Sequence, residues 1–208
     1  MKKLVIMLVA ALVSLTAAAE DNYFTAALSF DLSRPSNGGG AYKFGPGVGV
    51  GLNYTAFLTG GLFAQPGVKF YYHTSKANVP DIVKEIEGSV SLRKIGVDIP
   101  IVVGYQHSFT DNVAVKFFTG PMFDIGITNK FHWSQDIGGT KVTGNMDTYD
   151  SKNPIFKRFD VAWEIGAGVL ISNFVIGVRG DIGLLDISKI NDVKVRQNAI
   201  EISLGYAF

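Results

Sequence analysis

Acidic and basic residues alternate with apolar ones along several segments of the chain, and they are the first candidates for chemistry. Because side chains alternate between the two faces of a strand, these charges are predicted to share the inner face of a sheet. Burying an unpaired charge is costly, so we expect them to pair with one another and to fix strand register, with Glu164 and Arg179 as the best pair. A proton path or a site for a charged ligand is the alternative. The residues are Asp31, Lys69, Asp98, Lys116, Asp124, Asp160, Glu164, Arg179, Asp181 and Glu201.

The three histidines are the other candidates, because serine, histidine and a carboxylate together can catalyse acyl transfer. Each histidine has a serine nearby in sequence: His73 and Ser75, His107 and Ser108, and His132 and Ser134. Neighbouring residues of a strand point to opposite faces, which makes His107 and Ser108 a poor dyad. We therefore predict no catalytic residues and no enzyme, with a lipid-modifying enzyme kept as an alternative.

Metals, cofactors and nucleic acids are not predicted as ligands. No acid or histidine spacing suits a transition metal, and the acids Asp136, Asp147 and Asp150 lack the spacing of a calcium loop. The chain has no cysteine, which excludes thiol chemistry and disulfides. Its formal net charge of +1 gives no basic footprint for a nucleic acid.

The elements that must position the charges are eight segments with a two-residue period. In most of them one parity is apolar and the other is small, glycine or charged, and the apolar sets begin at Phe24, Val48, Leu62, Val97, Val113, Phe159, Phe174 and Ile200. The chain after residue 19 has no apolar run of about 18 residues, so it has no helical membrane span. The pattern predicts an all-β fold, either a soluble sandwich or a closed antiparallel up-and-down barrel in a membrane.

Three features favour the transmembrane barrel of about eight strands. The polar parity is rich in glycine and carries charges in mid-strand, as the narrow interior of a small barrel requires. Aromatic residues collect towards strand ends, which predicts two girdles. The connections alternate between short ones at 55–59, 106–112 and 172–173 and longer ones at 33–42, 73–90, 128–156 and 188–195. This asymmetry is typical of periplasmic turns and external loops.

Prolines within the predicted strands should disturb the ladder locally. Pro66, Pro100 and Pro121 each lack a backbone donor, so bulges are expected there. In the second long loop, Pro80–Glu87 followed by Gly88 has the pattern of a short helix.

The first 19 residues have the form of a secretory signal peptide. Lys2 and Lys3 precede the apolar run Leu4–Leu15, and the small residues Thr16–Ala19 follow it. We therefore predict a signal peptide over 1–19 and one barrel domain over 20–208. The barrel would lie in the outer membrane of a Gram-negative cell, with both termini of the mature chain periplasmic.

Almost the whole mature chain resembles the PorT-like outer-membrane β-barrel domains. The likeness is strongest from Gly96 to Tyr105, where a proline sits inside an apolar strand, and Phe118–Pro121, Phe159–Gly168 and Ser203–Phe208 add to it. The resemblance implies an exported leader, eight strands and a final aromatic residue. Because the family has no common catalytic residues, it implies a fold and little about activity.

We expect a non-enzymatic barrel with a structural role in the envelope or a partner-binding role through its external loops. In the loop 128–156, Phe131, Trp133 and Tyr149 are the candidates for contact with an extracellular protein or a glycan. Outer-membrane lipid and the barrel-assembly machinery are the other expected partners. The resemblance implies that this machinery reads Tyr206 and Phe208 as an assembly signal. The remaining alternatives are an accessory part of a secretion machine and a narrow channel.

Overall fold

The computed structural model describes residues 22–36, 42–77, 88–137, 140–150, 152, 154–190 and 194–208. The predicted signal peptide and the predicted helix at 80–87 lie outside the described residues. Among the residues described, no helix is long and apolar enough to cross a membrane.

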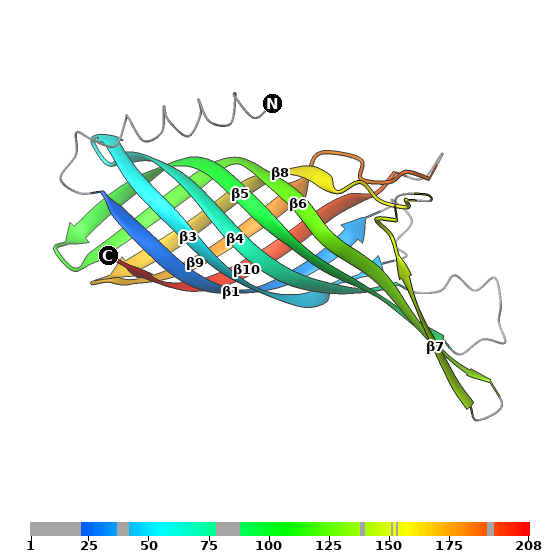
Figure 1. The fold of residues 1–208 in the computed structure, drawn as a ribbon. Helices are drawn as coiled ribbons and strands as arrows, with labels where there is room; N and C mark the ends of the chain where they lie inside the picture. Colours follow the sequence, from blue (N-terminus) through cyan, green and yellow to red (C-terminus); the bar gives the residue numbers. More distant parts are fainter. Residues whose placement is uncertain are drawn as a thin grey trace.

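Eight antiparallel strands close into a barrel (Figure 1). Around the ring they are β1 (Tyr23–Ser36), β3 (Gly45–Thr59), β4 (Leu62–Ala77), β5 (Gly88–Thr110), β6 (Val113–Ile137), β8 (Phe159–Ile171), β9 (Phe174–Gly183) and β10 (Arg196–Ala207). Pairing of β10 with β1 closes the ring. Two further strands, β2 (Tyr42–Lys43) and β7 (Thr140–Asp147), pair with β4 and β6 beyond it. The predicted all-β barrel is confirmed.

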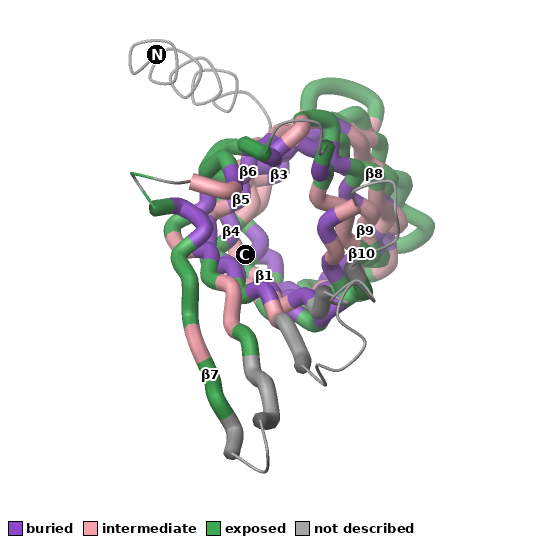
Figure 2. The backbone as a smooth tube through the Cα atoms, turned by 90° about the vertical axis from the view of Figure 1, so that its right-hand side faces the viewer, coloured by how far each residue is buried: buried purple, intermediate pink, exposed green. Residues whose placement is uncertain are grey.

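The two-residue period of the sequence sorts the side chains between the inside and the outside of the barrel. Along β1 and β10, apolar residues such as Leu28 and Ile202 are exposed, while their neighbours Ser29 and Glu201 are buried. In the view along the barrel axis, buried and exposed stretches alternate on the strands (Figure 2). The barrel therefore has an apolar exterior and a polar interior.

Three tight turns lie at one end of the barrel, together with the start of β1 and the end of β10. They are the residue pairs 60–61, 111–112 and 172–173, and the first uses glycines with φ of +56° and +86°. Such left-handed turns suit the twist of a hairpin. The first turn lies beyond the predicted 55–59 and the second is shorter than the predicted 106–112, because β3 and β5 continue to Thr59 and Thr110. At the same end, Phe24 and Phe208 exchange two backbone hydrogen bonds of 2.9 Å.

The prolines do not shift the register, so the predicted bulges at Pro66, Pro100 and Pro121 are wrong. Pairing keeps one register across Pro66 and Pro100 between β4 and β5, and across Pro121 between β6 and β8. Each proline leaves only a local gap in a ladder. A bulge occurs instead at Ile127, because Ile95 pairs with Thr128 while Gly96 pairs with Gly126. The register also shifts next to two of the tight turns, between Phe57 and Thr59 and between Ser108 and Thr110.

The other end of the barrel carries the long connections, and several strands extend past the ring there. β6 runs to Ile137 and returns as β7, so much of the segment predicted as a loop at 128–156 is a β-hairpin (Figure 1). The hairpin projects away from the barrel. Short turns at one end and long projections at the other give the molecule two different faces.

Aromatic rings contact one another around the short-turn end of the exterior. Phe24 lies 4.6 Å from Tyr54 and 6.1 Å from Phe208 between ring centroids, and Phe174 lies 5.5 Å from Tyr206. Towards the other end, Phe123 and Phe159 are 6.4 Å apart. The rings thus lie at two levels, as the sequence predicts.

Crowding of the interior predicts that Gly104 does not tolerate a larger residue. A Cβ atom there would meet the carbonyl oxygen of Phe117 and the ring of Phe63, whereas one at Gly180 has nothing within 4 Å. Gly104→Val should lose about 1–3 kcal/mol of unfolding free energy through overpacking. Gly180→Val should change it little. Urea unfolding in lipid vesicles measures both, and equal losses would show that interior crowding is not the cause.

Candidate functional site

The candidate site is the charged interior of the barrel, near its middle. The residues predicted to face inward are buried there, with Arg179 slightly more exposed than the rest. They come from seven strands of the ring: Asp31, Lys69, Asp98, Lys116, Asp124, Asp160, Glu164, Arg179, Asp181 and Glu201. The strand period thus placed all of them on the correct face.

Arg179 on β9 is the centre of the main ion-pair network. Its Nη1 lies 2.9 Å from Glu164 Oε2, and its Nη2 lies 3.0 Å from Glu201 Oε2. The Nε atom is 3.7 Å from Asp181 Oδ2. The two-residue turn at 172–173 sets this geometry, because it pairs Gly166 with Arg179 and leaves Glu164 as the diagonal neighbour. The predicted Glu164–Arg179 pair is present.

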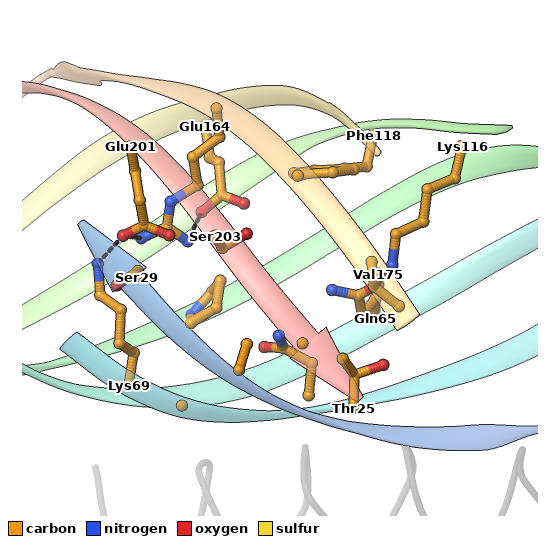
Figure 3. A pocket seen from close by; sticks show the side chains of 17 residues that line it. Thr25, Ser29, Gln65, Lys69, Lys116, Phe118, Glu164, Val175, Glu201 and Ser203 are labelled. Carbon is orange, nitrogen blue, oxygen red and sulfur yellow. Dashed lines mark hydrogen bonds and ion pairs between the residues drawn. The ribbon is translucent and has the colours of Figure 1, made fainter. Parts of the chain in front are cut away.

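Lys69 on β4 extends the network across the lumen to the opposite wall. Its Nζ lies 2.9 Å from Asp98 Oδ2 and 2.7 Å from Glu201 Oε2. Glu201 therefore joins Lys69 to Arg179, which stands directly opposite Glu201 on the neighbouring strand β9. Figure 3 shows the contact between Lys69 and Glu201. The bridge from β4 through Glu201 to β9 runs across the barrel interior.

A second cluster lies nearer the long-connection end, and the sequence analysis did not include its Lys94 among the inward charges. Lys94 pairs with Asp124, whose other oxygen accepts a 2.6 Å hydrogen bond from Tyr71 Oη. The Tyr71 ring stacks on His73 with centroids 4.0 Å apart, and His73 Nε2 lies 3.1 Å from Asp31 Oδ2. Lys94 lies two residues before Gly96 on the same parity, so extending the predicted strand would have found it.

Lys116 departs from the expectation that the interior charges pair with one another. No described carboxylate forms an ion pair with it. Instead, Nζ donates to Gln65 Oε1 at 3.1 Å, and this oxygen also accepts from Thr55 Oγ1 at 3.2 Å. Lys116 also lies over the rings of Tyr23 and Phe63, with Nζ 5.9 and 6.0 Å from their centroids. An amide and two aromatic faces take the place of an acid.

A cavity of about 70 Å³ lies between the Arg179 network and Lys116 (Figure 3). Thr25, Ser29 and Asn53 line it together with the charged residues. Since one water needs roughly 10–15 Å³ of such space, the cavity has room for a few water molecules. It is therefore a small polar chamber bounded by a charged barrier.

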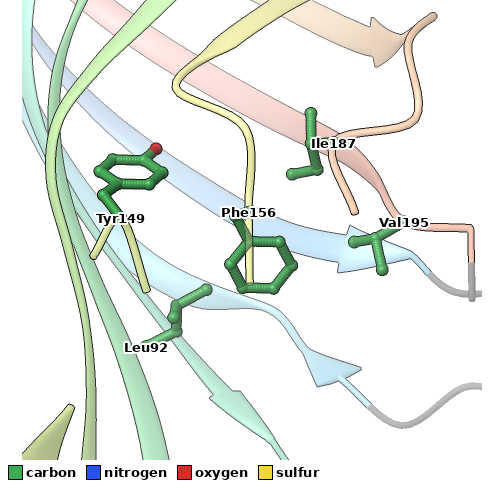
Figure 4. Close-up of a cluster of buried hydrophobic side chains, with 5 residues drawn as sticks. All are labelled: Leu92, Tyr149, Phe156, Ile187 and Val195. Carbon is green, nitrogen blue, oxygen red and sulfur yellow. The ribbon is translucent and has the colours of Figure 1, made fainter. Parts of the chain in front are cut away.

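Loops pack against one another at the long-connection end. Leu92, Tyr149, Phe156, Ile187 and Val195 form a buried apolar cluster, which we call the cap (Figure 4). Asp186 holds one of its loops by accepting hydrogen bonds from the backbone N–H groups of Ser188 and Val195, which lowers the pKa of its carboxyl. This end of the barrel thus has an apolar cluster of its own, apart from the charged interior.

The cap changes the interpretation of the aromatic residues that were expected to contact a partner. Tyr149 is only 5% exposed, so its assignment as an external contact residue is corrected: it packs over Gly126 and belongs to the cap. Phe131 is partly buried against the same cluster. Trp133, on the projecting hairpin, remains 38% exposed. The tertiary packing of the loop separates the three residues.

The histidines have neighbours other than serine. His73 lies beside Asp31 inside the barrel, His132 Nδ1 is 2.8 Å from Asn145 Oδ1, and the ring of His107 meets Phe109 edge-on at 4.8 Å. Within the described part of the chain, no three His, Cys, Asp or Glu residues are grouped so that they could hold a metal ion.

A closed barrel with an apolar exterior and an ion-paired interior defines the class of transmembrane β-barrels. Residues 5–208 match the outer membrane protein beta-barrel domain, and the chain belongs to this family. It is accordingly an integral protein of the outer membrane. A comparison with curated protein sequences found no match.

Solved structures with a similar course of the chain include three outer-membrane proteins. Ail of Yersinia pestis, in complex with the heparin analogue sucrose octasulfate, is 16% identical, with a TM-score of 0.45 over 90% of this chain and 99% of that one. The neisserial surface protein NspA is 16% identical, with a TM-score of 0.41 over 89% of this chain and 97% of that one. The outer-membrane enzyme PagL is 13% identical, with a TM-score of 0.40 over 87% of this chain and 99% of that one. At these scores the alignments carry no inference about what this chain does.

The Arg179 network predicts an uneven response to removing its cations. Arg179→Met leaves Glu164, Asp181 and Glu201 buried without their main partner and should lose about 3–5 kcal/mol of unfolding free energy. Adding Glu164→Gln should restore part of that loss. Lys116→Met, which breaks no ion pair, should cost less than Arg179→Met. Urea unfolding in vesicles measures all three, and equal losses for the two cations would contradict the central place of Arg179.

Proposed function

We propose that this protein is a closed, non-enzymatic barrel that presents its long-connection end outside the cell and binds a partner there. The observation that carries the proposal is the contrast between a blocked lumen and a projecting hairpin. Lys69, Glu201 and Arg179 bridge the interior, and the cap packs at the long-connection end. The β6–β7 hairpin exposes Trp133 and Met146 beyond the ring.

The proposed orientation follows from the asymmetry of the two ends. Bacterial outer-membrane barrels have short periplasmic turns and longer external loops. The turns at 60–61, 111–112 and 172–173 would then face the periplasm, together with the two ends of the domain. Tyr206 and Phe208 would be accessible there to the barrel-assembly machinery. The signal peptide over 1–19 belongs to the same proposal, because the chain must be exported first.

The partner is proposed to be an extracellular protein or a glycan. The resemblance to PorT-like barrels favours a second candidate, in which the barrel serves as an accessory part of a secretion machine. Both candidates place function on the external surface rather than in the lumen. A lipid-modifying role receives less support, because among the described residues no hydrogen bond joins a serine to any of the three histidines, although His73 has an acid beside it.

A blocked lumen predicts no ion conductance. In planar bilayers the protein should give no resolved current steps, because Lys69, Arg179 and their acids bridge the narrow interior. Replacing both Arg179 and Glu201 by alanine should produce small steps, whereas Lys152→Ala on an exposed loop should not. Steps of defined size in the unaltered protein would instead support the narrow channel.

The hairpin predicts a separable external role. Replacing residues 132–145 with Asn-Gly should leave the barrel folded, because the ring pairings of β6 with β5 and β8 up to residue 131 are kept. Cells with this variant should be as sensitive to detergent as cells without the protein. Measuring the proteins that the same strains secrete into the medium distinguishes a part in a secretion machine from the binding of an extracellular partner. Full complementation in both assays would contradict a role for the hairpin.

A further inference from the structure

Lys116 is a buried cation in the half of the barrel interior that lies between the Arg179 network and the tight turns. Its side chain belongs to a residue that is only 5% exposed. Within the described part of the chain, the other inward side chains of this half are uncharged: small, hydroxyl, amide or apolar groups. A buried charge is costly unless another charge or several hydrogen bonds compensate it. Lys116 therefore lacks the acidic partners that Lys69 and Arg179 have.

The contacts of the Lys116 ammonium do not use all of its hydrogen-bond donors. An ammonium has three N–H donors and no acceptor. One donor goes to Gln65 Oε1 at 3.1 Å, an oxygen that also accepts from Thr55. The rings of Tyr23 and Phe63 lie about as far away as a cation–π contact allows, at 5.9 and 6.0 Å. The ammonium thus keeps donors for a further ligand.

The polar chamber next to Lys116 contains two more groups without a partner. Thr25 Oγ1 and Ser29 Oγ are buried, and neither forms a hydrogen bond with the described residues. Both residues lie on β1, across the ring from β6, which carries Lys116. Figure 3 shows Thr25, Ser29 and Lys116 around the same chamber. Buried polar atoms normally have a partner, so the chamber calls for a ligand that accepts hydrogen bonds.

The charges that line the chamber favour an anion over a cation. They are Lys69, Lys116, Arg179, Glu164 and Glu201, which makes three cations and two acids. Both acids are already paired with Arg179, at 2.9 and 3.0 Å. Asp98 and Asp181 also contact Lys69 and Arg179 but do not line the chamber. The lining therefore keeps one uncompensated positive charge, at Lys116.

The size of the chamber restricts the anion to a small one. Its volume of about 70 Å³ has room for a few water molecules, and a halide ion is only slightly larger than one water. At the short-turn end, a hollow between the tight turns is lined by Tyr23 and Gln106, whose side chains share a 2.9 Å hydrogen bond. Tyr23 borders both this hollow and Lys116. The short-turn end is therefore the side from which an ion would enter.

We propose that the chamber binds a small monovalent anion of halide size, with Lys116 as its counter-charge and the hydroxyls of Thr25 and Ser29 as further donors. The anion does for this half of the interior what the acids do for the other half. It explains why a lysine stands there without an acid. The proposal depends neither on the orientation of the barrel nor on the role of the hairpin.

The test uses the full folded barrel in non-ionic detergent, with chloride as the probe. At fixed ionic strength, the urea unfolding midpoint should rise along a saturating curve as chloride replaces gluconate, which is too large for the chamber, because an ion that binds only the folded state stabilises it. Lys116→Met should raise the half-saturating chloride concentration about tenfold or more, since a hydrogen bond to a charge is lost with the charge itself. The pair Thr25→Val and Ser29→Ala should raise it by a smaller factor. Lys152→Met removes a lysine from an exposed loop and should leave the chloride response unchanged.

Two further measurements make the result decisive. Heat-modifiable migration on a detergent gel shows that each variant is a folded barrel. In crystals grown with bromide, an anomalous peak should lie within hydrogen-bond distance of Lys116 Nζ. Three outcomes would overturn the proposal: equal midpoints in chloride and gluconate, an undiminished chloride response in folded Lys116→Met, or no bromide in the chamber.

Discussion

Closure of the sheet between β1 and β10 is the constraint on which the rest of the structure depends. In lipid an open strand edge would leave backbone groups without hydrogen-bond partners, and closure removes both edges at once. The pairing of Phe24 with Phe208 completes the ring at the short-turn end. A ring of eight strands is narrow, so every inward side chain must fit beside those from the opposite wall.

The polar interior is a direct result of that narrowness. Large inward side chains lie over glycines: Tyr71 would collide with a Cβ at Gly96, and Phe118 with one at Gly166. Charges brought so close together must neutralise one another, and Arg179 and Lys69 do so by sharing Glu201. The same contacts that satisfy the buried charges also bridge the interior from one wall to the other. Closure of the ring and filling of its interior therefore have the same cause.

The two ends of the barrel are built on different principles. At the short-turn end, hairpins of two residues are tied to one another by backbone hydrogen bonds, as between Ser172 and Asn112. At the other end, loops distant in sequence meet in the cap, where Leu92 packs with Phe156 and Val195. The β6–β7 hairpin is the main projection at this end. Surface chemistry of this molecule is thus concentrated at one end.

The sequence by itself determined the fold class and the orientation of side chains, because the period of two is a local property that burial must obey. It placed Asp98, Glu164 and Glu201 on the inside and, through one tight turn, paired Glu164 with Arg179. Tertiary structure decided everything that depends on distant contacts. The strand register does not change at Pro66, Pro100 or Pro121, because the residue pairs on both sides of each proline hold it. Tyr149 packs in the cap rather than on the surface, and Lys116 bonds to the Gln65 amide rather than to an acid. Both outcomes depend on which side chains the closed ring brings together.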